Sequence, residues 1–362
     1  MQTTPDTYSI GPDGGAEAGR PILLVPYMWI GDFVRCHTVV RLLNARFPGR
    51  PVDILTSTNT APLVDYMPGA RKGIVWDLPR RRLALGLQRG LAARLRAEGY
   101  GQSLVMPRTW KAALAPFLAG IPVRTGFAGE ARFGLLNDIR WGEKALPRMV
   151  DRCAALALPR GAPLPELPLP QLRVPAGEIT AWRGRNGVSA GVPAGGRRVA
   201  ALAPGAVGPS KRWSYYAELA VRLAGEGFEV WVVGGPGERD IAAQMAARHP
   251  AIRDLTGTDL RNAIVALAAA DVVISNDSGL LHVAAAIGTP SIGIFGPTSP
   301  WHWAPLNPIS AIIQAATDLP CRPCHEPVCR LLHHGCMRDI PVEAVAAATH
   351  AALNAEAAAA PR

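Results

Sequence analysis

The chain lacks the long apolar runs that membrane-spanning proteins carry. Gly, Pro, Asp or Asn interrupts every apolar stretch well before the ~18 residues that a transmembrane helix needs. The N-terminal stretch MQTTPDTYSIGPDGG has no basic region followed by an apolar core, which is the pattern of a secretory signal. We therefore expect a cytoplasmic protein without a transmembrane anchor.

Two nucleotide-binding patterns are also missing. No G-x-G-x-x-G follows the first predicted strand, which argues against a nicotinamide-dependent Rossmann enzyme. The glycine-rich stretch 203–213 contains a lysine, but not with the G-x-x-x-x-G-K-[ST] spacing of a P-loop. Aromatic residues make up 6% of the chain and show no RNP-like pattern, so we expect no nucleic-acid partner.

The composition that remains is that of a soluble globular protein. With 362 residues, 49% hydrophobic and 18% charged, the chain is long enough for two domains with separate cores. The formal net charge is +10, and residues 1–150 hold 20 Lys+Arg against 11 Asp+Glu, which is +9. One-sided basicity favours an anionic partner: nucleic acid, a phospholipid surface or a phosphorylated substrate. The alternative is a solvated helix face, because a local cluster contains Arg80, Arg81, Arg82, Arg89, Arg94 and Arg96.

Strand and helix signals alternate along both halves, and this predicts an α/β fold of two Rossmann-like, doubly wound parallel sheets. In the first half, the predicted strands are 21–26, 51–57, 73–78 and 102–107, and the predicted helices are 34–47, 61–67 and 83–98. In the second half, the predicted strands are 197–205, 228–235, 252–257 and 271–275, and the predicted helices are 213–227, one from 237, 260–270 and an Ala-rich one after 342.

A proline-rich hinge separates the two halves. Six prolines between 159 and 175 preclude regular helix or central strand. We therefore predict an N-terminal domain over 1–170, a C-terminal domain over 171–345 and a tail or helix over 346–362. No internal repeat is evident in the sequence.

Ligands bind doubly wound sheets at the carboxyl ends of their strands, where four loops carry suitable residues. In the first loop, Gly31 permits close backbone approach, and Asp32 is either a helix N-cap or a general base. In the second, the amides near Gly205, Gly208 and Ser210, with the charge of Lys211, suit a diphosphate.

The third loop contains Gly234 to Gly237 and then Glu238, which either reaches ribose hydroxyls or belongs to an ordinary turn. The fourth is the motif NDSG. Ser278, Gly279 and Leu280 present amides at a helix N-terminus, where an anion is favoured. Asp277 is expected to cap the helix or to accept from a ligand hydroxyl, and His282 to face either the ligand or the core.

Four of the six cysteines lie close together in the late segment CRPCHEPVCRLLHHGC. A C-x2-C pair followed by two more cysteines is similar to a metal knuckle, but the spacing matches no common zinc module. Whether these residues bind a structural metal stays open, and no metal ligand is assigned. Cys36 and Cys153 are expected to be buried apolar residues. The four late cysteines are Cys321, Cys324, Cys329 and Cys336.

Together these motifs resemble the lipopolysaccharide heptosyltransferases of glycosyltransferase family 9. The resemblance covers about residues 21–345, and a further stretch, 109–141, is similar to the heptosyltransferase II subgroup. The first motif departs from the family pattern in its flanks, where PYM precedes it and Arg35-Cys36-His37 follows it. The carrying motifs are WIGD (29–32), PGA…SKRW (204–213), NDSG to GPTSP (276–300) and CRPC…C…CM (321–337).

The resemblance implies a GT-B fold, whose two Rossmann-like domains face each other across a cleft. It implies ADP-L-glycero-D-manno-heptose as donor, a heptosyl-Kdo2-lipid A inner core as acceptor, inversion at the anomeric carbon and no required cofactor. Asp32 would then be the base, and Lys211 with the amides of Ser278–Leu280 would stabilise the departing ADP. The anionic acceptor and the anionic inner leaflet would be the partners of the basic half, at the cytoplasmic face of the inner membrane. The alternative is a family 9 transferase with a different donor sugar or acceptor.

Overall fold

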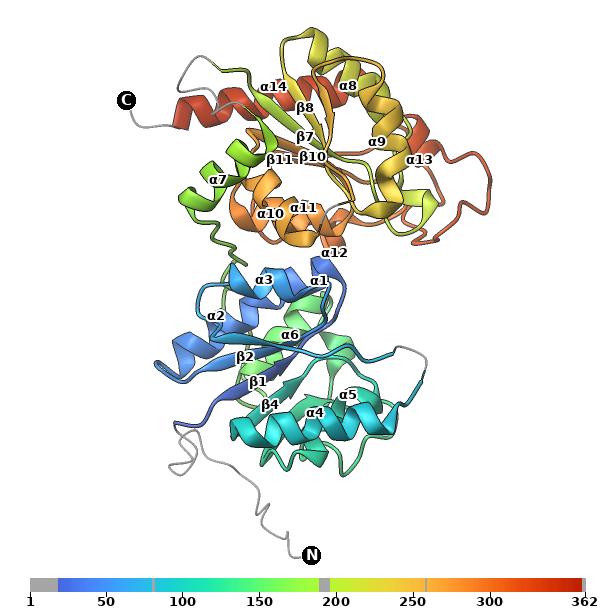
Figure 1. Ribbon diagram of the computed structural model, residues 1–362. Coiled ribbons are helices and arrows are strands. Elements are labelled where there is room, and N and C mark those ends of the chain that lie inside the picture. Colours follow the sequence, from blue (N-terminus) through green and yellow to red (C-terminus); the bar gives the residue numbers. More distant parts are fainter. Residues whose placement is uncertain (1–18, 80–81, 189–195, 258, 360–362) are drawn as a thin grey trace, which may run out of the picture. The chain divides into compact units, whose positions relative to one another are not determined.

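The computed structural model describes residues 19–79, 82–188, 196–257 and 259–359 (Figure 1). The N-terminal stretch in which no secretory signal was expected lies outside them. The chain forms two compact units. The first comprises Met1–Tyr27, Thr38–Asp65 and Gly69–Pro168, and the second comprises Met28–His37, Tyr66–Pro68 and Leu169–Arg362.

The first unit contains a six-stranded parallel sheet with the order β3-β2-β1-β4-β5-β6. Its strands are β1 (Ile22–Val25), β2 (Val52–Thr56), β3 (Lys72–Val75), β4 (Gln102–Val105), β5 (Val123–Phe127) and β6 (Asp138–Arg140). Its helices are α2 (His37–Arg46), α3 (Ala61–Asp65), α4 (Leu85–Glu98), α5 (Trp110–Leu118), the short η1 (Glu143–Ala145) and α6 (Met149–Ala157).

The four predicted strands of the first half are confirmed as β1 to β4. A strand covered on both faces has no solvent side, so β1, with the sequence ILLV, is buried at every position. Two strands were missed. β5 mixes polar with apolar residues, and β6 is a three-residue edge strand, so neither produces an apolar run.

The helix predicted over 34–47 is divided in two at Cys36. The first part is α1 (Ile30–Arg35), which groups with the second unit, whereas α2 from Thr38 onward groups with the first. The sequence pattern did not reveal the break at Cys36, because both helices bury apolar residues and the apolar spacing continues across it. Val34 of α1 and Val39 of α2 are both within 1% of complete burial.

The second unit repeats the topology of the first. Its parallel sheet has the order β12-β11-β10-β7-β8-β9. If β7 is counted as the first strand and the sheet is read from the β9 edge, this is the strand order of the first unit. The chain changes direction across the sheet between β7 and β10, and a doubly wound sheet binds ligands at that switch point. The strands are β7 (Val199–Ala203), β8 (Glu229–Val232), β9 (Ile252–Asp254), β10 (Val272–Asn276), β11 (Ser291–Ile294) and β12 (Ala311–Ile313).

Ten further helices complete the described part of the second unit beside α1. They are α7 (Ala176–Asn186), η3 (Pro209–Lys211), α8 (Tyr216–Gly225), η4 (Pro236–Glu238), α9 (Arg239–Ala246), α10 (Leu260–Ala269), α11 (Gly279–Ile287), α12 (Pro300–Trp303), α13 (Gly335–Arg338) and α14 (Val342–Ala359). The predicted C-terminal helix is confirmed as α14, which contacts β10, β11 and β12. β11 and β12 were not predicted as strands.

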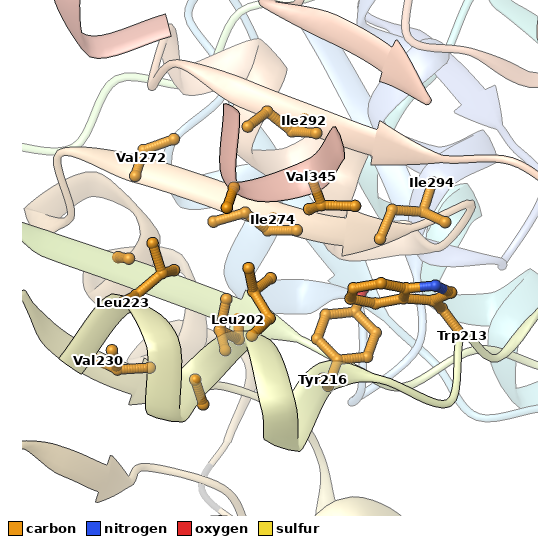
Figure 2. Close-up of a cluster of buried hydrophobic side chains, with 14 of the residues drawn as sticks. Leu202, Trp213, Tyr216, Leu223, Val230, Val272, Ile274, Ile292, Ile294 and Val345 are labelled. Atoms are coloured by element: carbon orange, nitrogen blue, oxygen red, sulfur yellow. The ribbon is translucent and has the colours of Figure 1, made fainter. Parts of the chain in front are cut away.

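The core of the second unit lies between its sheet and the helices α8 and α14. Figure 2 shows Leu202, Ile274 and Ile292 from three neighbouring strands pointing toward one side, together with Leu223 of α8 and Val345 of α14. The buried positions of α8 recur every three or four residues, which is the spacing of one helix face. The apolar residues that recur at helical spacing in the sequence therefore form the face of α8 that packs against the sheet.

The proline-rich stretch has the irregular structure that its composition predicts. Residues 162–175 form neither helix nor strand, and the first unit ends within them at Pro168. The predicted α/β class with two doubly wound parallel sheets is confirmed. Among the residues described, no helix combines the length and the apolar character needed to cross a bilayer.

Candidate active site

The switch point of the second sheet is held together by Asn276, the last residue of β10. Its side chain is fully buried and donates to the carbonyl of Pro204 at 2.7 Å, while the backbone N–H of Trp213 donates to its Oδ1 at 3.2 Å. One amide side chain thus spans both ends of the loop 204–213, which follows β7. The loop is fixed beside the start of α11 as a result.

Lys211 and Asp277 meet beside this clamp. The ammonium Nζ of Lys211 lies 2.7 Å from Oδ2 of Asp277, and the hydroxyl of Thr298 donates to the same oxygen at 2.7 Å. Asp277 is buried, whereas 28% of the Lys211 side chain is exposed. A buried carboxylate needs a cation and hydrogen-bond donors beside it, and Lys211 forms an ion pair with Asp277.

Ser210 faces the cysteine-rich segment instead of a ligand. Its hydroxyl donates to the carbonyl of Glu326, its backbone N–H donates to the carbonyl of Pro327 at 3.1 Å, and its carbonyl lies 2.6 Å from Nε2 of His334. Ser210 is buried. The expectation that its donors face a diphosphate is therefore corrected: it fastens the Lys211 loop to residues 326–334.

Through these contacts with Ser210, the cysteine-rich segment supports the Lys211 loop. Within the described part of the chain, no three His, Cys, Asp or Glu side chains gather closely enough to hold a metal ion, and all six cysteines are unbridged. Cys336 is buried, and burial together with the neighbouring cysteines raises its pKa to about 11. Cys36 and Cys153 are buried, as predicted.

The N-terminus of α11 follows Asp277 directly. Its N-cap residue is Ser278, whose hydroxyl lies 3.0 Å from that of Ser275. The expectation that Asp277 caps this helix is wrong, because its carboxylate is turned to Lys211 and Thr298. Ser278, Gly279 and Leu280 remain partly exposed, so the helix start is open to solvent.

Helix α1 packs across α11 at a distance that only glycines allow. A Cβ on Gly279 would lie 2.6 Å from Cβ of Ile30, and a Cβ on Gly31 would lie 2.7 Å from Cδ2 of His282. Contacts this short are essentially never seen for real Cβ atoms, so any larger residue would push the helices apart. Gly31 was expected to permit a close approach to the backbone, and in the structure it is helix α11 that makes this approach.

This packing brings Asp32 next to the Lys211–Asp277 pair. The N-cap of α1 is Trp29, so Asp32 lies inside the helix and is not its cap. Burial raises the pKa of the Asp32 carboxyl; Arg35 lowers it, Asp277 raises it and Lys211 lowers it. Asp32, Lys211 and Asp277 are therefore one electrostatic cluster, and all three belong to the second unit, although Asp32 was expected in an N-terminal domain over 1–170.

His282 takes the core-facing alternative. It is 5% exposed, its ring lies against Gly31, and it shares a hydrogen bond with the backbone of Trp303. Burial, Arg35 and Lys211 together hold its pKa well below the ordinary histidine value, so the ring is neutral at pH 7. The expected direct contact of His282 with the donor is thus replaced by contacts with α1 and α12.

Glu238 lies apart from this cluster, at the end of β8. Its Oε2 accepts from the backbone N–H of Gly235 at 2.9 Å, and its side chain covers Gly205 and Gly234. A Cβ at Gly205 would lie 2.7 Å from Oε1 of Glu238. The carboxylate therefore sits between the loops that follow β7 and β8, and it remains partly exposed.

The profile of glycosyltransferase family 9, described as a heptosyltransferase family, matches residues 88–334, which is more than half of the chain. The chain belongs to glycosyltransferase family 9. It is 38% identical to lipopolysaccharide heptosyltransferase 2 of Escherichia coli K12 over 82% of this chain and 88% of the relative. It is 37% identical to the Salmonella typhimurium protein of the same name, with the same coverage.

A solved structure gives the same result for the fold. The E. coli ADP-heptose lipopolysaccharide heptosyltransferase II superposes with a TM-score of 0.81 at 33% sequence identity, covering 93% of this chain and 99% of that one. The predicted GT-B class is confirmed by this match and by the two six-stranded parallel sheets.

In this family 9 chain, part of the basic excess of the first half has structural uses. Arg71 pairs with buried Asp53, with N–O distances of 2.7 and 2.6 Å, and buried Arg132 donates to the carbonyls of Phe127 and Pro107. Of the predicted cluster, Arg82, Arg89, Arg94 and Arg96 are exposed, whereas Arg80 and Arg81 lie outside the described residues. The exposed arginines fit the solvated-face alternative and an anionic partner equally.

Several site residues were missed from the sequence. Asn276 and Thr298 lie in the NDSG-to-GPTSP motif, but their roles depend on which loops meet at the switch point. Arg35 was noted only as a departure from the family pattern, and Trp303 was not considered. The available signal was an arginine three residues after Asp32, a spacing that places both side chains on one helix face.

Replacing Gly31 with Ala tests the close packing of α1 on α11. The added methyl group has to displace the His282 ring, so we expect a loss of about 1–3 kcal/mol in the free energy of unfolding. The matched control is Gly184→Ala in α7, where a Cβ meets nothing within 4 Å. Removing a helix glycine there should stabilise by roughly 0.5–1 kcal/mol. Thermal and urea unfolding report both; equal effects of the two substitutions would contradict the packing argument.

Proposed function

We propose that this family 9 glycosyltransferase moves L-glycero-D-manno-heptose from ADP-heptose to the heptosyl-Kdo2-lipid A inner core of lipopolysaccharide. Membership in the heptosyltransferase family and identity to two heptosyltransferase 2 proteins support the donor and the acceptor. The observation that carries the proposal is the grouping of Asp32 with Lys211 and Asp277 in one compact unit. A base and a cation for the leaving group are thereby present together.

The reaction is a single displacement. Asp32 removes the proton from an acceptor hydroxyl, the hydroxyl oxygen forms a bond to the anomeric carbon of heptose, and the bond between that carbon and the diphosphate breaks. ADP leaves with the electron pair, and the anomeric configuration inverts. A positioned base contributes typically ~10²–10⁴-fold to such a step.

Burial suits Asp32 to this task. A carboxyl with a raised pKa is a stronger base once ionised than an ordinary surface aspartate, while Arg35 and Lys211 oppose the shift. Its side chain is 21% exposed, so the carboxylate is accessible to a substrate.

The donor diphosphate is proposed to lie at the open start of α11. The amides of Ser278, Gly279 and Leu280 and the ammonium of Lys211 stabilise the charge that develops on ADP. Asp277 orients Lys211, Ser210 fastens its loop, and the partly exposed Glu238 accepts from ribose hydroxyls. No cofactor is required in this scheme.

The acceptor is proposed to bind the basic first unit, and the nucleotide sugar the second. Exposed arginines of the first unit fit the phosphates and carboxylates of a lipid A core and an anionic membrane surface. We propose that the enzyme works as a peripheral protein at the cytoplasmic face of the inner membrane.

The proposed activity is tested by incubating the protein with ADP-heptose and a heptose-deficient core acceptor and weighing the product. The acceptor should gain one heptose, with ADP released in equal amount. A panel of other nucleotide sugars serves as control. Preference for a different donor sugar would support the alternative family 9 transferase and contradict heptose transfer.

Asp32→Asn should abolish transfer while leaving ADP-heptose binding nearly intact, because the amide cannot take the proton. In the wild type, the rate should fall as pH decreases through a pKa above the 3.8 of an ordinary aspartate. Because the folded-state pKa is raised, the stability due to the bound proton is present below the unfolded pKa and lost as pH rises through the folded one. The variant, which mimics the protonated form, should therefore melt at the same or a higher temperature at pH 7. Retained turnover would exclude Asp32 as the base.

Lys211→Ala should raise the dissociation constant of ADP by at least about 10-fold, because a charged contact to phosphate is lost. It also leaves buried Asp277 without its cation, so stability falls as well. The double variant with Asp277→Asn removes both charges and should recover stability but not ADP affinity. Calorimetric titration together with thermal unfolding separates the two effects. Recovery of ADP affinity in the double variant would contradict the assignment.

A further inference from the structure

The side chain of Arg35 is the buried group that the proposed chemistry does not yet use. It lies on α1 one turn after Asp32 and is 3% exposed. Its Nη1 is 3.6 Å from Oδ1 of Asp32, and its Nη2 donates to the carbonyls of Trp303 and of Ala304, the latter at 3.2 Å. Its guanidinium carbon lies 5.6 Å from the centre of the Trp303 ring.

We propose that Arg35 is a positioning residue for the transfer reaction, whose buried guanidinium ties the Asp32 carboxylate to the C-terminal end of α12. The inference rests on the proposed function only in giving Asp32 the role of base. Arg35 does not touch the substrate in this scheme. It acts through Asp32, by holding its place and its charge state.

The geometry requires a side chain of this kind. Arginine stays protonated even when buried, and its planar fork can bond two partners at once. Here the partners are a carboxylate on α1 and the last carbonyls of a short helix, where a cation is favoured. Lysine could supply the charge but not the two-sided fork.

The charges around Asp32 make the contribution of Arg35 specific. Asp32 faces Arg35 on its own helix, and Asp277 and Lys211 at the switch point act on the same carboxyl. The neutral His282 ring of α11 lies against the neighbouring Gly31. Lys211 is engaged with Asp277 at 2.7 Å. The charge of Arg35 opposes the effect of burial on the Asp32 pKa more strongly than Lys211 does, so without Arg35 the carboxyl would hold its proton to higher pH.

The test compares Arg35→Met, which keeps an unbranched stem but loses the charge and the fork, with Arg35→Lys, which keeps the charge. In Arg35→Met the acidic limb of the kcat–pH profile should move to higher pH. The decrease in kcat relative to the wild type should be at least about threefold greater on the acidic limb than on the plateau. KM for ADP-heptose should stay within about threefold, because the donor site is intact. Arg35→Lys should restore the midpoint but not the full plateau rate.

A matched control is Arg132→Met in the first unit. Arg132 is equally buried and donates to the carbonyls of Phe127 and Pro107. Its loss should lower stability without moving the midpoint of the profile. An unmoved midpoint in Arg35→Met, or an equal movement in Arg132→Met, would overturn the proposal.

A second measurement distinguishes failure of this inference from failure of the proposed function. If wild-type protein transfers no heptose, the function fails, but the coupling of Arg35 with Asp32 is still measurable by unfolding. Asp32→Asn should raise the melting temperature at pH 7 more in the Arg35→Met background than in the wild type, because the ionised carboxyl is then less well compensated. Equal gains in the two backgrounds would overturn the role of Arg35 whatever the substrate is.

Discussion

The close packing of α1 on α11 is the contact on which the site depends. Two glycines, Gly31 and Gly279, remove the side chains that would keep the helices apart. The backbone of α1 then approaches the helix start that follows Asp277. Because Asp32 lies in the first turn of α1, this approach places a partly buried carboxylate within the field of Lys211 and Asp277. The basicity of Asp32 is thus a result of helix packing.

Around this contact, the site is built from buried polar groups that each serve a neighbour. Asn276 holds both ends of the Lys211 loop, Ser210 fastens the same loop to the cysteine-rich segment, and Thr298 supports Asp277. Each of these three buried side chains therefore has a hydrogen-bond partner, as low-dielectric surroundings favour. The groups proposed to meet the ligand are the more exposed ones. These buried hydrogen bonds hold the Lys211 loop beside the start of α11.

Of the twelve strands in the described residues, the sequence predicted β1 to β4 and β7 to β10. β1, β2, β7 and β10 are buried at every position, whereas β3 and β9 were recognised although they are partly exposed. β5, β6, β11 and β12 were missed, since they are short, lie at the outer positions or carry polar residues. The motifs named Asp32, Lys211 and Asp277 one by one, but neither their grouping in the second unit nor the direction of each side chain. The orientation of Ser210 depends on Pro327, and that of His282 depends on Trp303. Each partner lies more than 20 residues along the chain, so no local pattern encodes these orientations.

The division of the chain into compact units does not follow the order of residues. Met28–His37 lies between stretches of the first unit but belongs to the second. A fragment beginning at Leu169 would carry the proposed leaving-group residues and leave the base behind on the other piece. The two halves of the gene therefore do not encode two separable halves of the chemistry. Any recombination at the proline-rich stretch would exchange Asp32 together with the first sheet, and the exchanged α1 would have to fit against an unrelated α11.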